Sequence, residues 1–228
     1  MSDIIVISGF NQGLGSECAA RLLARGDRVF GLSRSGRTLA TPHARFHAET
    51  CDLTSETAVQ ETFLRIKKDF GAPGVLIHNA ARLLLDDFTQ IGTEAFEAVL
   101  RTNVTSAFLC AQAVLPDMLA AGKGTLIFSG ATASVKAGAR SGAFAASKFA
   151  LRGMAQSLAR AYQKQGIHVV HPIIDGVIWG ERAEKVFGMD RNACIAPAHL
   201  ADIYLNLIEQ PRSCWTHELD IRPALEVF

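Results

Sequence analysis

The chain has 228 residues, with 23 Lys and Arg against 22 Asp and Glu, so its formal net charge is +1. That balance argues against an electrostatic grip on nucleic acid or on an anionic membrane, because both require a concentrated basic surface. Hydrophobic residues make up 49% and charged residues 20%, a composition typical of a folded globular protein rather than a disordered one.

The predicted elements alternate along the chain between short β-like runs and helical stretches. Strands are predicted at residues 4–7, 28–32, 45–48, 75–77, 125–128, 168–170 and 218–221. Helices are predicted at about 13–24, 55–70, 93–120, 143–165 and 198–209. Strands separated by helices indicate βαβ units and a parallel sheet covered on both faces. The expected fold is α/β, a single doubly wound, Rossmann-like sheet with helices on both faces, formed by one domain over residues 1–228.

The cysteines and histidines point to no metal or redox site. Five Cys are scattered without a close pair, as expected of free thiols in a reducing cytosol. Seven His show no HExxH pattern, so no metal site is predicted. The apolar run at residues 4–7 is too short for a secretory signal, and no run approaches a membrane span. We therefore expect a cytoplasmic protein that does not bind membranes.

A glycine-rich loop follows the first predicted strand and leads into the first helix, reading Ser8-Gly9-Phe10-Asn11-Gln12-Gly13-Leu14-Gly15. Glycines at such a turn permit positive φ and let the backbone approach a pyrophosphate at the free helix N-terminus. The alternative is an ordinary tight turn. The position of the loop, opening the first βαβ unit, favours dinucleotide binding.

The G-x-x-x-G-x-G spacing resembles that of the short-chain dehydrogenase/reductase (SDR) family, and three further landmarks extend the resemblance over nearly the whole chain. Cys51-Asp52-Leu53-Thr54 looks like the family's acidic contact to adenine; Asp52 could alternatively cap the next helix, or do both. His78-Asn79-Ala80-Ala81 resembles the N-N-A-G element, with His and Ala as departures, and Asn103 stands where the family has its helical Asn. The cofactor contacts that the resemblance implies in these segments are Gly9, Asn11, Gln12, Gly13, Leu14, Gly15, Asp52, Leu53, Asn79, Ala80 and Ala81.

The end of the second strand bears on the choice of dinucleotide. NAD-dependent members of the family usually place an acidic residue there, whereas this chain has Ser33-Arg34, with Arg37 nearby. A guanidinium can pair with a 2′-phosphate that a carboxylate would repel. We therefore expect NADP(H) to be preferred over NAD(H), the alternative being that Arg34 is a solvated loop charge.

Two of the four residues on which catalysis rests in this family are substituted. The family arranges Tyr and Lys as Y-x-x-x-K on one helix, so that the ammonium can lower the pKa of the phenol. Here Lys148 matches and Phe144 occupies the tyrosine position, while Ala131 stands 13 residues before it, where the family has Ser. Only Asn103 and Lys148 remain as catalytic candidates, and Lys148 could also bind the ribose hydroxyls of the cofactor.

Replacements for the missing hydroxyls are limited. Ser129, Thr132, Ser134 and Ser141 lie near the site in sequence, but aliphatic hydroxyls are poor proton donors at neutral pH. Tyr162 lies 14 residues beyond Lys148 on the same helix, about 21 Å along its axis, and Tyr204 is expected in the core or an interface. Asn103 is either a hydrogen-bonded polar residue of the core or part of a water-holding relay to Lys148.

Two functions remain open on this sequence. The first is an NADP(H)-dependent oxidoreductase of SDR type that acts on a small carbonyl, alcohol or activated alkene through a non-standard or weakened proton relay. The second is a catalytically inactive NADP(H)-binding homologue that serves as a sensor, scaffold or subunit partner. The resemblance also implies that backbone near Ile178 meets the nicotinamide carboxamide, that residues 179–196 form a substrate lid, and that the chain assembles as a homodimer or homotetramer.

Overall fold

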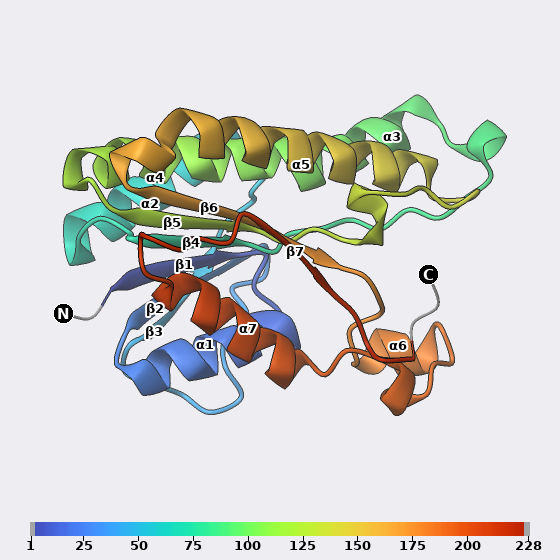
Figure 1. The fold of residues 1–228 in the computed structure, drawn as a ribbon, viewed down its shortest axis with the longest axis horizontal. Helices are drawn as coiled ribbons and strands as arrows, with labels where there is room; N and C mark the ends of the chain where they lie inside the picture. The colour runs from blue at the N-terminus through green and yellow to red at the C-terminus, as the bar shows by residue number, and fades with distance from the viewer. Residues whose placement is uncertain (1–2, 226–228) are drawn as a thin grey trace.

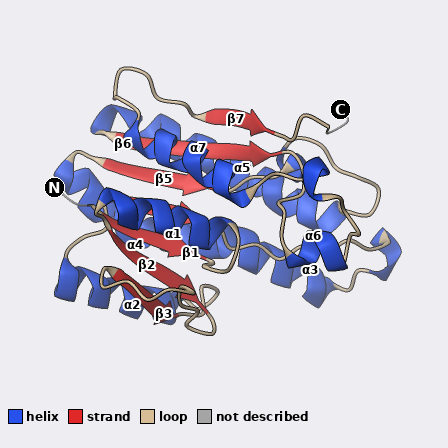
Figure 2. Cartoon of the chain, turned by 90° about the horizontal axis from the view of Figure 1, so that it is seen from below, coloured by secondary structure: helices blue, strands red, loops and turns tan. Residues whose placement is uncertain are grey.

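Seven parallel strands form the sheet, in the order β3-β2-β1-β4-β5-β6-β7 (Figure 2). The computed structural model describes residues 3–225, so the ends of the expected domain, residues 1–2 and 226–228, lie outside the described residues. The strands are β1 Ile4–Ser8, β2 Arg28–Ser33, β3 Phe46–Thr50, β4 Val75–His78, β5 Gly124–Phe128, β6 Ile167–Ile174 and β7 Glu218–Ile221. The strand order reverses between β1 and β4, and ligands of such sheets bind at the carboxyl ends of the strands near this reversal.

Helices cover both faces of the sheet, which confirms the doubly wound α/β class (Figure 1). The α-helices are α1 Leu14–Arg25, α2 Glu56–Phe70, α3 Thr93–Leu100, α4 Ser106–Ala121, α5 Gly142–Tyr162, α6 Glu181–Lys185 and α7 Pro197–Glu209. A π-helical segment, Arg101–Thr105, joins α3 to α4. Short 3₁₀ helices are Phe88–Gln90, Thr132–Ser134, Gln163–Gln165 and Arg191–Ala193. Helices α1 and α7 lie on one face, and α2, α4 and α5 on the other.

The central strands β1, β4 and β5 are mostly apolar because both of their faces are buried. Ile5 and Ile7 of β1 pack with α1 and α7, whereas Val6 between them packs with α2, α4 and α5. Burial of one such side chain contributes about 1.5–3 kcal/mol relative to exposure. This alternation divides the core into two layers, one on each side of the sheet.

Three local features differ from the sequence-based expectation. The predicted helix at 93–120 is interrupted by the π-helical segment Arg101–Thr105, and π-helical turns of this kind often occur at functional sites. Strand β6 extends to Ile174, well beyond the predicted 168–170, because it pairs with β5 and β7 at successive positions. The expected lid at 179–196 contains the short helix α6.

The helical stretch Thr93–Ala121 is long and apolar enough to cross a membrane by length and composition alone, contrary to the expectation that no run approaches a span. Within this fold, 44% of its most apolar window is buried. The α4 residues Ala107, Cys110, Val114 and Met118 form part of the core on that face. Packing against the sheet therefore accounts for the apolar composition of this stretch.

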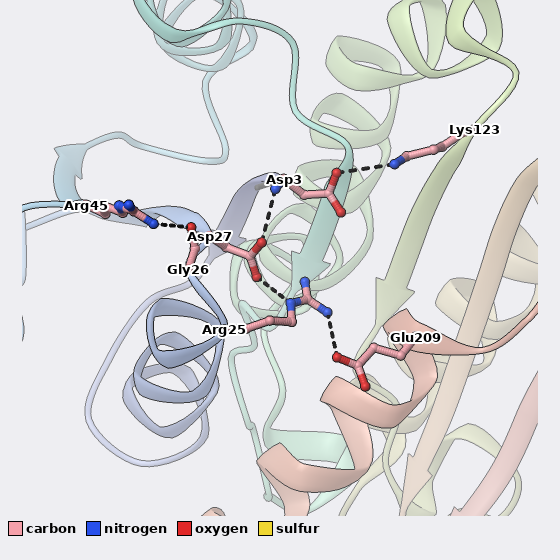
Figure 3. A network of polar contacts seen from close by, with 7 residues as sticks. All are labelled: Asp3, Arg25, Gly26, Asp27, Arg45, Lys123 and Glu209. Carbon is pink, nitrogen blue, oxygen red and sulfur yellow. Dashed lines mark hydrogen bonds and ion pairs between the residues drawn. The ribbon is translucent and has the colours of Figure 1, made fainter. Parts of the chain in front are cut away.

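A network of charged side chains links the segments at the amino-terminal ends of the strands (Figure 3). The buried Asp27 carboxylate accepts hydrogen bonds from the Asp3 backbone N–H at 3.0 Å and from Arg25 Nε at 2.7 Å. Arg25 also pairs with Glu209 at the end of α7, at 3.2 Å. Lys123 reaches Asp3 at 3.3 Å. These contacts lie at the opposite end of the sheet from the glycine-rich loop.

Candidate functional site

The glycine-rich loop places an open helix N-terminus at the carboxyl end of β1. Gly9 and Gly13 have φ of 76° and 93°, which favour glycine. A Cβ atom at Gly9 would lie 2.4 Å from the Ala80 Cα atom, so only glycine lets this loop approach the segment after β4. Gly13 caps α1 without a side-chain hydrogen bond, and a Cβ there would meet no atom within 4 Å. The loop therefore leaves space and free N–H groups, which suits a pyrophosphate.

The other loop residues are arranged in accord with this cradle. Asn11 and Gln12 are exposed beside Gly13, whereas Leu14 and Gly15 are buried where α1 begins. Phe10 is buried against Gly31 and Phe46, where it anchors the loop to β2 and β3. The backbone thus supplies the binding surface while Phe10 fixes its position.

The segment after β4 forms the opposite wall. Asn79 donates its backbone N–H to the Ser8 carbonyl at 2.9 Å, and Ala80 lies against Gly9. Ala81 is exposed at the surface of this wall. His78, which the sequence placed after the strand, is the last residue of β4 and is fully buried.

His78 connects the end of β1 to the start of α4 through both of its ring nitrogens. Nδ1 lies 2.7 Å from Ser8 Oγ, and Nε2 lies 3.1 Å from Ser106 Oγ. Because Ser106 donates its own proton to the Thr102 carbonyl, His78 Nε2–H donates to Ser106 and Nδ1 accepts from Ser8. Burial, with the nearby Lys148 charge, lowers the pKa of His78 to about 3, so this histidine is neutral.

The adenine end of the site is formed by β2 and by the turn after β3. Arg34 is exposed directly after β2, and within residues 3–225 no hydrogen bond holds its guanidinium. Ser33 Oγ accepts the Arg37 backbone N–H at 2.8 Å, which shapes the turn around Arg34. Leu53 is buried.

Asp52 does not cap the helix that follows it. Asp52 accepts the backbone N–H and the hydroxyl of Thr54, at 3.0 and 2.8 Å, and these bonds lower the pKa of its carboxyl. The residue that caps α2 is Ser55, whose hydroxyl accepts the Ala58 N–H. The capping alternative for Asp52 was therefore wrong, and its exposed carboxylate faces solvent beside Arg34, whose charge acts on it.

Asn103 lies in the π-helical segment and is fully buried. Its Oδ1 accepts the Arg82 backbone N–H at 2.7 Å, and its Nδ2 donates to the Arg82 carbonyl at 3.2 Å and to Ser147 Oγ at 2.8 Å. Both polar atoms of the amide are thus bonded within the protein, as burial requires. Asn103 therefore fits the role of a hydrogen-bonded polar residue of the core, and the water-holding relay to Lys148 stays a prediction.

Lys148 is 3% exposed and reaches the carboxyl end of β5 from α5. Its Nζ donates to the Ser129 carbonyl at 2.7 Å. The Phe144 ring lies one helical turn before it, with its centroid 5.7 Å from Nζ. Burial lowers the pKa of Lys148 from 10.5 to about 8, because a low-dielectric environment disfavours the ammonium. The site therefore holds a readily ionisable amine but no phenol beside it.

Ala131, at the family serine position, is partly exposed in the loop after β5. Each of the four nearby hydroxyls has a partner inside the protein: Ser129 Oγ accepts from Tyr204 at 2.9 Å, Thr132 Oγ1 donates to Asp175 at 2.6 Å, Ser134 Oγ contacts His171 Nε2 at 3.0 Å, and Ser141 Oγ bonds Gly138. None of them occupies the vacated serine position.

The two tyrosines lie where the sequence placed them, away from the missing phenol. Tyr204 is fully buried in the core formed with α1, and burial raises the pKa of its phenol. Its hydroxyl nevertheless reaches Ser129, the residue whose carbonyl holds Lys148. Tyr162 packs at the far end of α5.

The loop after β6 folds back on itself. Ile178 pairs with Ile195 in an isolated β-bridge, and Trp179 donates its N–H to the Ile195 carbonyl at 2.8 Å. The two ends of the expected lid are therefore bonded to each other, and α6 lies between them (Figure 1).

Sequence reasoning gave no role to three buried polar residues at this end of the sheet: His78, His171 and Asp175. His171 lies beside Gly130, where a Cβ atom would be 2.7 Å from its Nε2. Asp175 is 5% exposed and binds Thr132. The SDR family usually has Pro-Gly after the sixth strand, whereas this chain has Asp175-Gly176, and this departure was the available signal for Asp175. His171 gave none, because a histidine within an apolar strand carries no partner information in sequence.

Comparison with known proteins connects this geometry to one family. Residues 3–181 match the short chain dehydrogenase family. A 2-(R)-hydroxypropyl-CoM dehydrogenase from Xanthobacter autotrophicus is 33% identical over 178 residues, which cover 73% of this chain and 71% of the relative. A short-chain dehydrogenase structure from Rhodopseudomonas palustris is 31% identical, covers 96% of this chain and 98% of its own, and has a TM-score of 0.83.

A second similar structure has NADPH bound. It is a Tyr-to-Phe variant of ElxO with NADPH bound, 22% identical, covering 96% of this chain and 97% of its own, with a TM-score of 0.86. Structures that share this fold hold NADP, NADH or NAD⁺ as well, so the fold is one that takes a nicotinamide dinucleotide. From the family match and from relatives above 30% identity, this chain belongs to the short-chain dehydrogenase family of oxidoreductases.

Proposed function

We propose that the protein is an NADP(H)-dependent oxidoreductase that interconverts a small alcohol and its carbonyl compound through a proton relay lacking the family's phenol and serine. The observation that carries the proposal is the buried Lys148, held at 2.7 Å on the Ser129 carbonyl at the carboxyl edge of the sheet. Burying an ammonium is costly, and a binding or proton-transfer role accounts for its retention at this edge.

The residues at the carboxyl ends of β1 and β4 fit a dinucleotide. The open N-terminus of α1 at Gly13 suits the pyrophosphate, and Gly9 lets the Ala80 segment close the opposite wall. When bound, the dinucleotide supplies hydride chemistry. Asn11, Gln12, Leu14, Gly15, Asp52, Leu53, Asn79, Ala81 and Ile178 complete the proposed contacts.

Lys148 would both bind the ribose of the cofactor and exchange a proton during the reaction. Its Nζ has one bond, to Ser129, which leaves two N–H groups for ribose hydroxyls. With a pKa of about 8, the amine can give up or take a proton near neutral pH. Asn103 acts on this site indirectly, by fixing the Arg82 backbone and Ser147 next to Lys148.

The preference for NADP(H) rests on Arg34, which is exposed after Ser33 and free to pair with a 2′-phosphate. Arg34→Ala should weaken NADPH binding much more than NADH binding. Arg45→Ala is the matched control, because Arg45 bonds the Gly26 carbonyl at the amino edge of the sheet. Equal weakening of both nucleotides by Arg34→Ala would refute the assignment.

A second function, cofactor binding without turnover, is favoured by one observation. Phe144 and Ala131 carry no ionisable or hydroxyl group, and the hydroxyls around them are bonded within the protein. A general acid contributes about 10²–10⁴-fold to rate, so its loss alone could silence the site.

A nucleotide titration combined with a turnover screen separates the two functions. Wild-type turnover that is lost in Lys148→Ala supports the oxidoreductase. Tight NADPH binding, no wild-type turnover and activity gained in a Phe144→Tyr, Ala131→Ser double variant support the silent cofactor-binding protein. Binding of neither NADPH nor NADH would refute both.

We also propose that the chain folds as one domain with a substrate lid at about 179–196 and assembles in the cytoplasm as a homodimer or homotetramer. Phe108 of α4 and Phe149 of α5 are large exposed aromatic residues on the two long helices, which supports a contact between copies. The five cysteines are free thiols, as in a reducing compartment. Light scattering on Phe108→Ser and Phe149→Ser variants tests the assembly, and an unchanged mass would contradict this contact.

A further inference from the structure

We propose that Thr132, oriented by Asp175, takes over from the family serine as the hydroxyl that orients the substrate, and that it does so as a hydrogen-bond acceptor. The site would then select ligands that carry an O–H donor, such as an alcohol, over ligands that offer only a carbonyl oxygen. This inference rests on the proposed oxidoreductase function and adds the residue that sets its substrate preference.

The pair sits directly beside the vacated serine position. Thr132 follows Ala131 and begins the 3₁₀ turn Thr132–Ser134 after β5. Asp175 follows β6, at the place where the chain departs from the family's Pro-Gly. The two side chains meet at 2.6 Å, from Thr132 Oγ1 to Asp175 Oδ1. Thr132 is partly exposed, whereas Asp175 is 5% exposed.

The direction of this hydrogen bond determines what Thr132 can offer a ligand. A hydroxyl has one proton and two lone pairs, and an ionised carboxylate can only accept. The Thr132 proton therefore points to Asp175, and the remaining polar capacity of the hydroxyl is as an acceptor. A family serine with a free proton can donate to a carbonyl, so the polarity of this position is reversed.

Asp175 is held firmly enough to impose that direction. Its backbone N–H donates to the Ile221 carbonyl at 2.8 Å, and its Oδ2 lies 3.6 Å from Arg222 Nη2. The Arg222 guanidinium thus lies on the side of the carboxylate away from Thr132, which contacts Oδ1. The carboxylate also gains one charge-assisted hydrogen bond from Thr132.

The other hydroxyls near Ala131 are less suited to this role. Ser134 is fully buried, where its Oγ accepts the Ala131 N–H at 3.1 Å and contacts His171. Ser129 Oγ faces the core formed with α7, toward Tyr204. Thr132 thus combines partial exposure with a fixed proton.

The experiment compares two ligands that cannot react. With the protein saturated with NADP⁺, cyclohexanone cannot be reduced and the tertiary alcohol 1-methylcyclohexanol cannot be oxidised, so both binding constants are measured on one cofactor form by ligand-observed NMR. Acyclic alcohol and ketone pairs of the same kind widen the panel. We expect the alcohols to bind more tightly by about 2- to 12-fold, the value of one net hydrogen bond.

Variants test whether the preference for alcohols over ketones depends on Thr132 and Asp175. Thr132→Val, which keeps the shape, should abolish the preference, and Thr132→Ser should retain it. Asp175→Asn should reduce or reverse it, because the amide can donate to Thr132 Oγ1 and release the threonine proton toward a carbonyl. Thr89→Val removes a similar Thr-Asp hydrogen bond, to Asp87 at 2.6 Å on the surface, and should change nothing.

Several results would overturn the inference. Ketones that bind the wild type as tightly as the alcohols across the panel would do so, as would a preference that survives Thr132→Val. Absence of NADP⁺ binding would instead count against the proposed function. If Thr132→Val fails to fold, the Asp175→Asn and Thr132→Ser ratios still decide the question.

Discussion

Replacing Lys148 with Met should make the protein more stable at neutral pH while weakening its hold on the cofactor. Lys148 is 3% exposed, and burial lowers its pKa from 10.5 to about 8. That drop corresponds to about 3 kcal/mol, since each pKa unit is worth 1.36 kcal/mol. Loss of the Nζ bond to the Ser129 carbonyl offsets about 1 kcal/mol of this. The expected net gain is about 2 kcal/mol, or roughly 4–8 °C in Tm for a chain of this size.

The stability difference between Lys148→Met and the wild type should decrease as the pH rises. Between about pH 8 and 10.5 the unfolded chain holds a proton on Lys148 that the native protein has released, so wild-type stability from this group rises with pH. The advantage of Lys148→Met should therefore be full below pH 8 and shrink as the pH approaches 10.5.

Urea unfolding of both proteins at pH 7 and pH 10 measures the effect, at one protein concentration because assembly shifts apparent stability. Lys123→Met, at an exposed lysine of the amino edge, is the control for loss of a surface charge. A Lys148→Met variant that is less stable than wild type at pH 7, or a difference that does not change with pH, would refute the reasoning.

Three further predictions concern other parts of the fold. Gly9→Ala should reduce or abolish nucleotide binding, because its Cβ would lie 2.4 Å from the Ala80 Cα atom at a φ of 76°; calorimetric titration with NADPH checks this, and unchanged affinity would contradict the close approach. Asp27→Ala should lower the free energy of unfolding by about 1–3 kcal/mol, because the change leaves the Asp3 N–H and Arg25 Nε without their acceptor; nucleotide affinity should be preserved, since these groups lie at the amino edge. Glu218→Gln should destabilise the protein at pH 7 but hardly at all near pH 2. The Arg152 bond lowers the pKa of Glu218 from 4.5 to about 2, so its contribution is present above 4.5 and lost as the pH falls through 2; equal destabilisation at both pH values would count against it.

The sequence predicted the fold well because its signals are local and strong. Strand β7 and helix α2 lie within one residue of their predicted bounds, and the alternation of strands and helices led directly to the doubly wound class. The interruption at Arg101–Thr105 was not predicted, because helix-forming residues continue on both sides of it without a Gly or Pro to mark a break. The end of β6 depended on pairing with β7, which is distant in sequence.

The candidate site was likewise predicted only where its signals are local. The phosphate loop could be predicted because its backbone conformation requires glycines at fixed spacing. The partners of Thr132, Ser134 and Asn103 were not, because each bond joins segments 21 to 44 residues apart whose approach depends on the folded sheet. The capping role suggested for Asp52 failed for a local reason, since Ser55 is closer to the start of α2.

Cofactor binding and proton transfer depend on different parts of this chain, so one can be lost while the other is kept. The cradle for the dinucleotide is formed largely by backbone, through Gly9, Gly13 and the end of α1, so side-chain substitutions elsewhere leave it intact. The proton-transfer half depends on single side chains. Phe144 keeps the ring that lies near Lys148 and lacks only the hydroxyl a tyrosine would add. Because Phe144 and Ala131 are partly exposed, hydroxyls restored there would not be buried without partners. The double variant should therefore fold as the wild type does, which makes its catalysis a direct measure of what the two missing hydroxyls contribute.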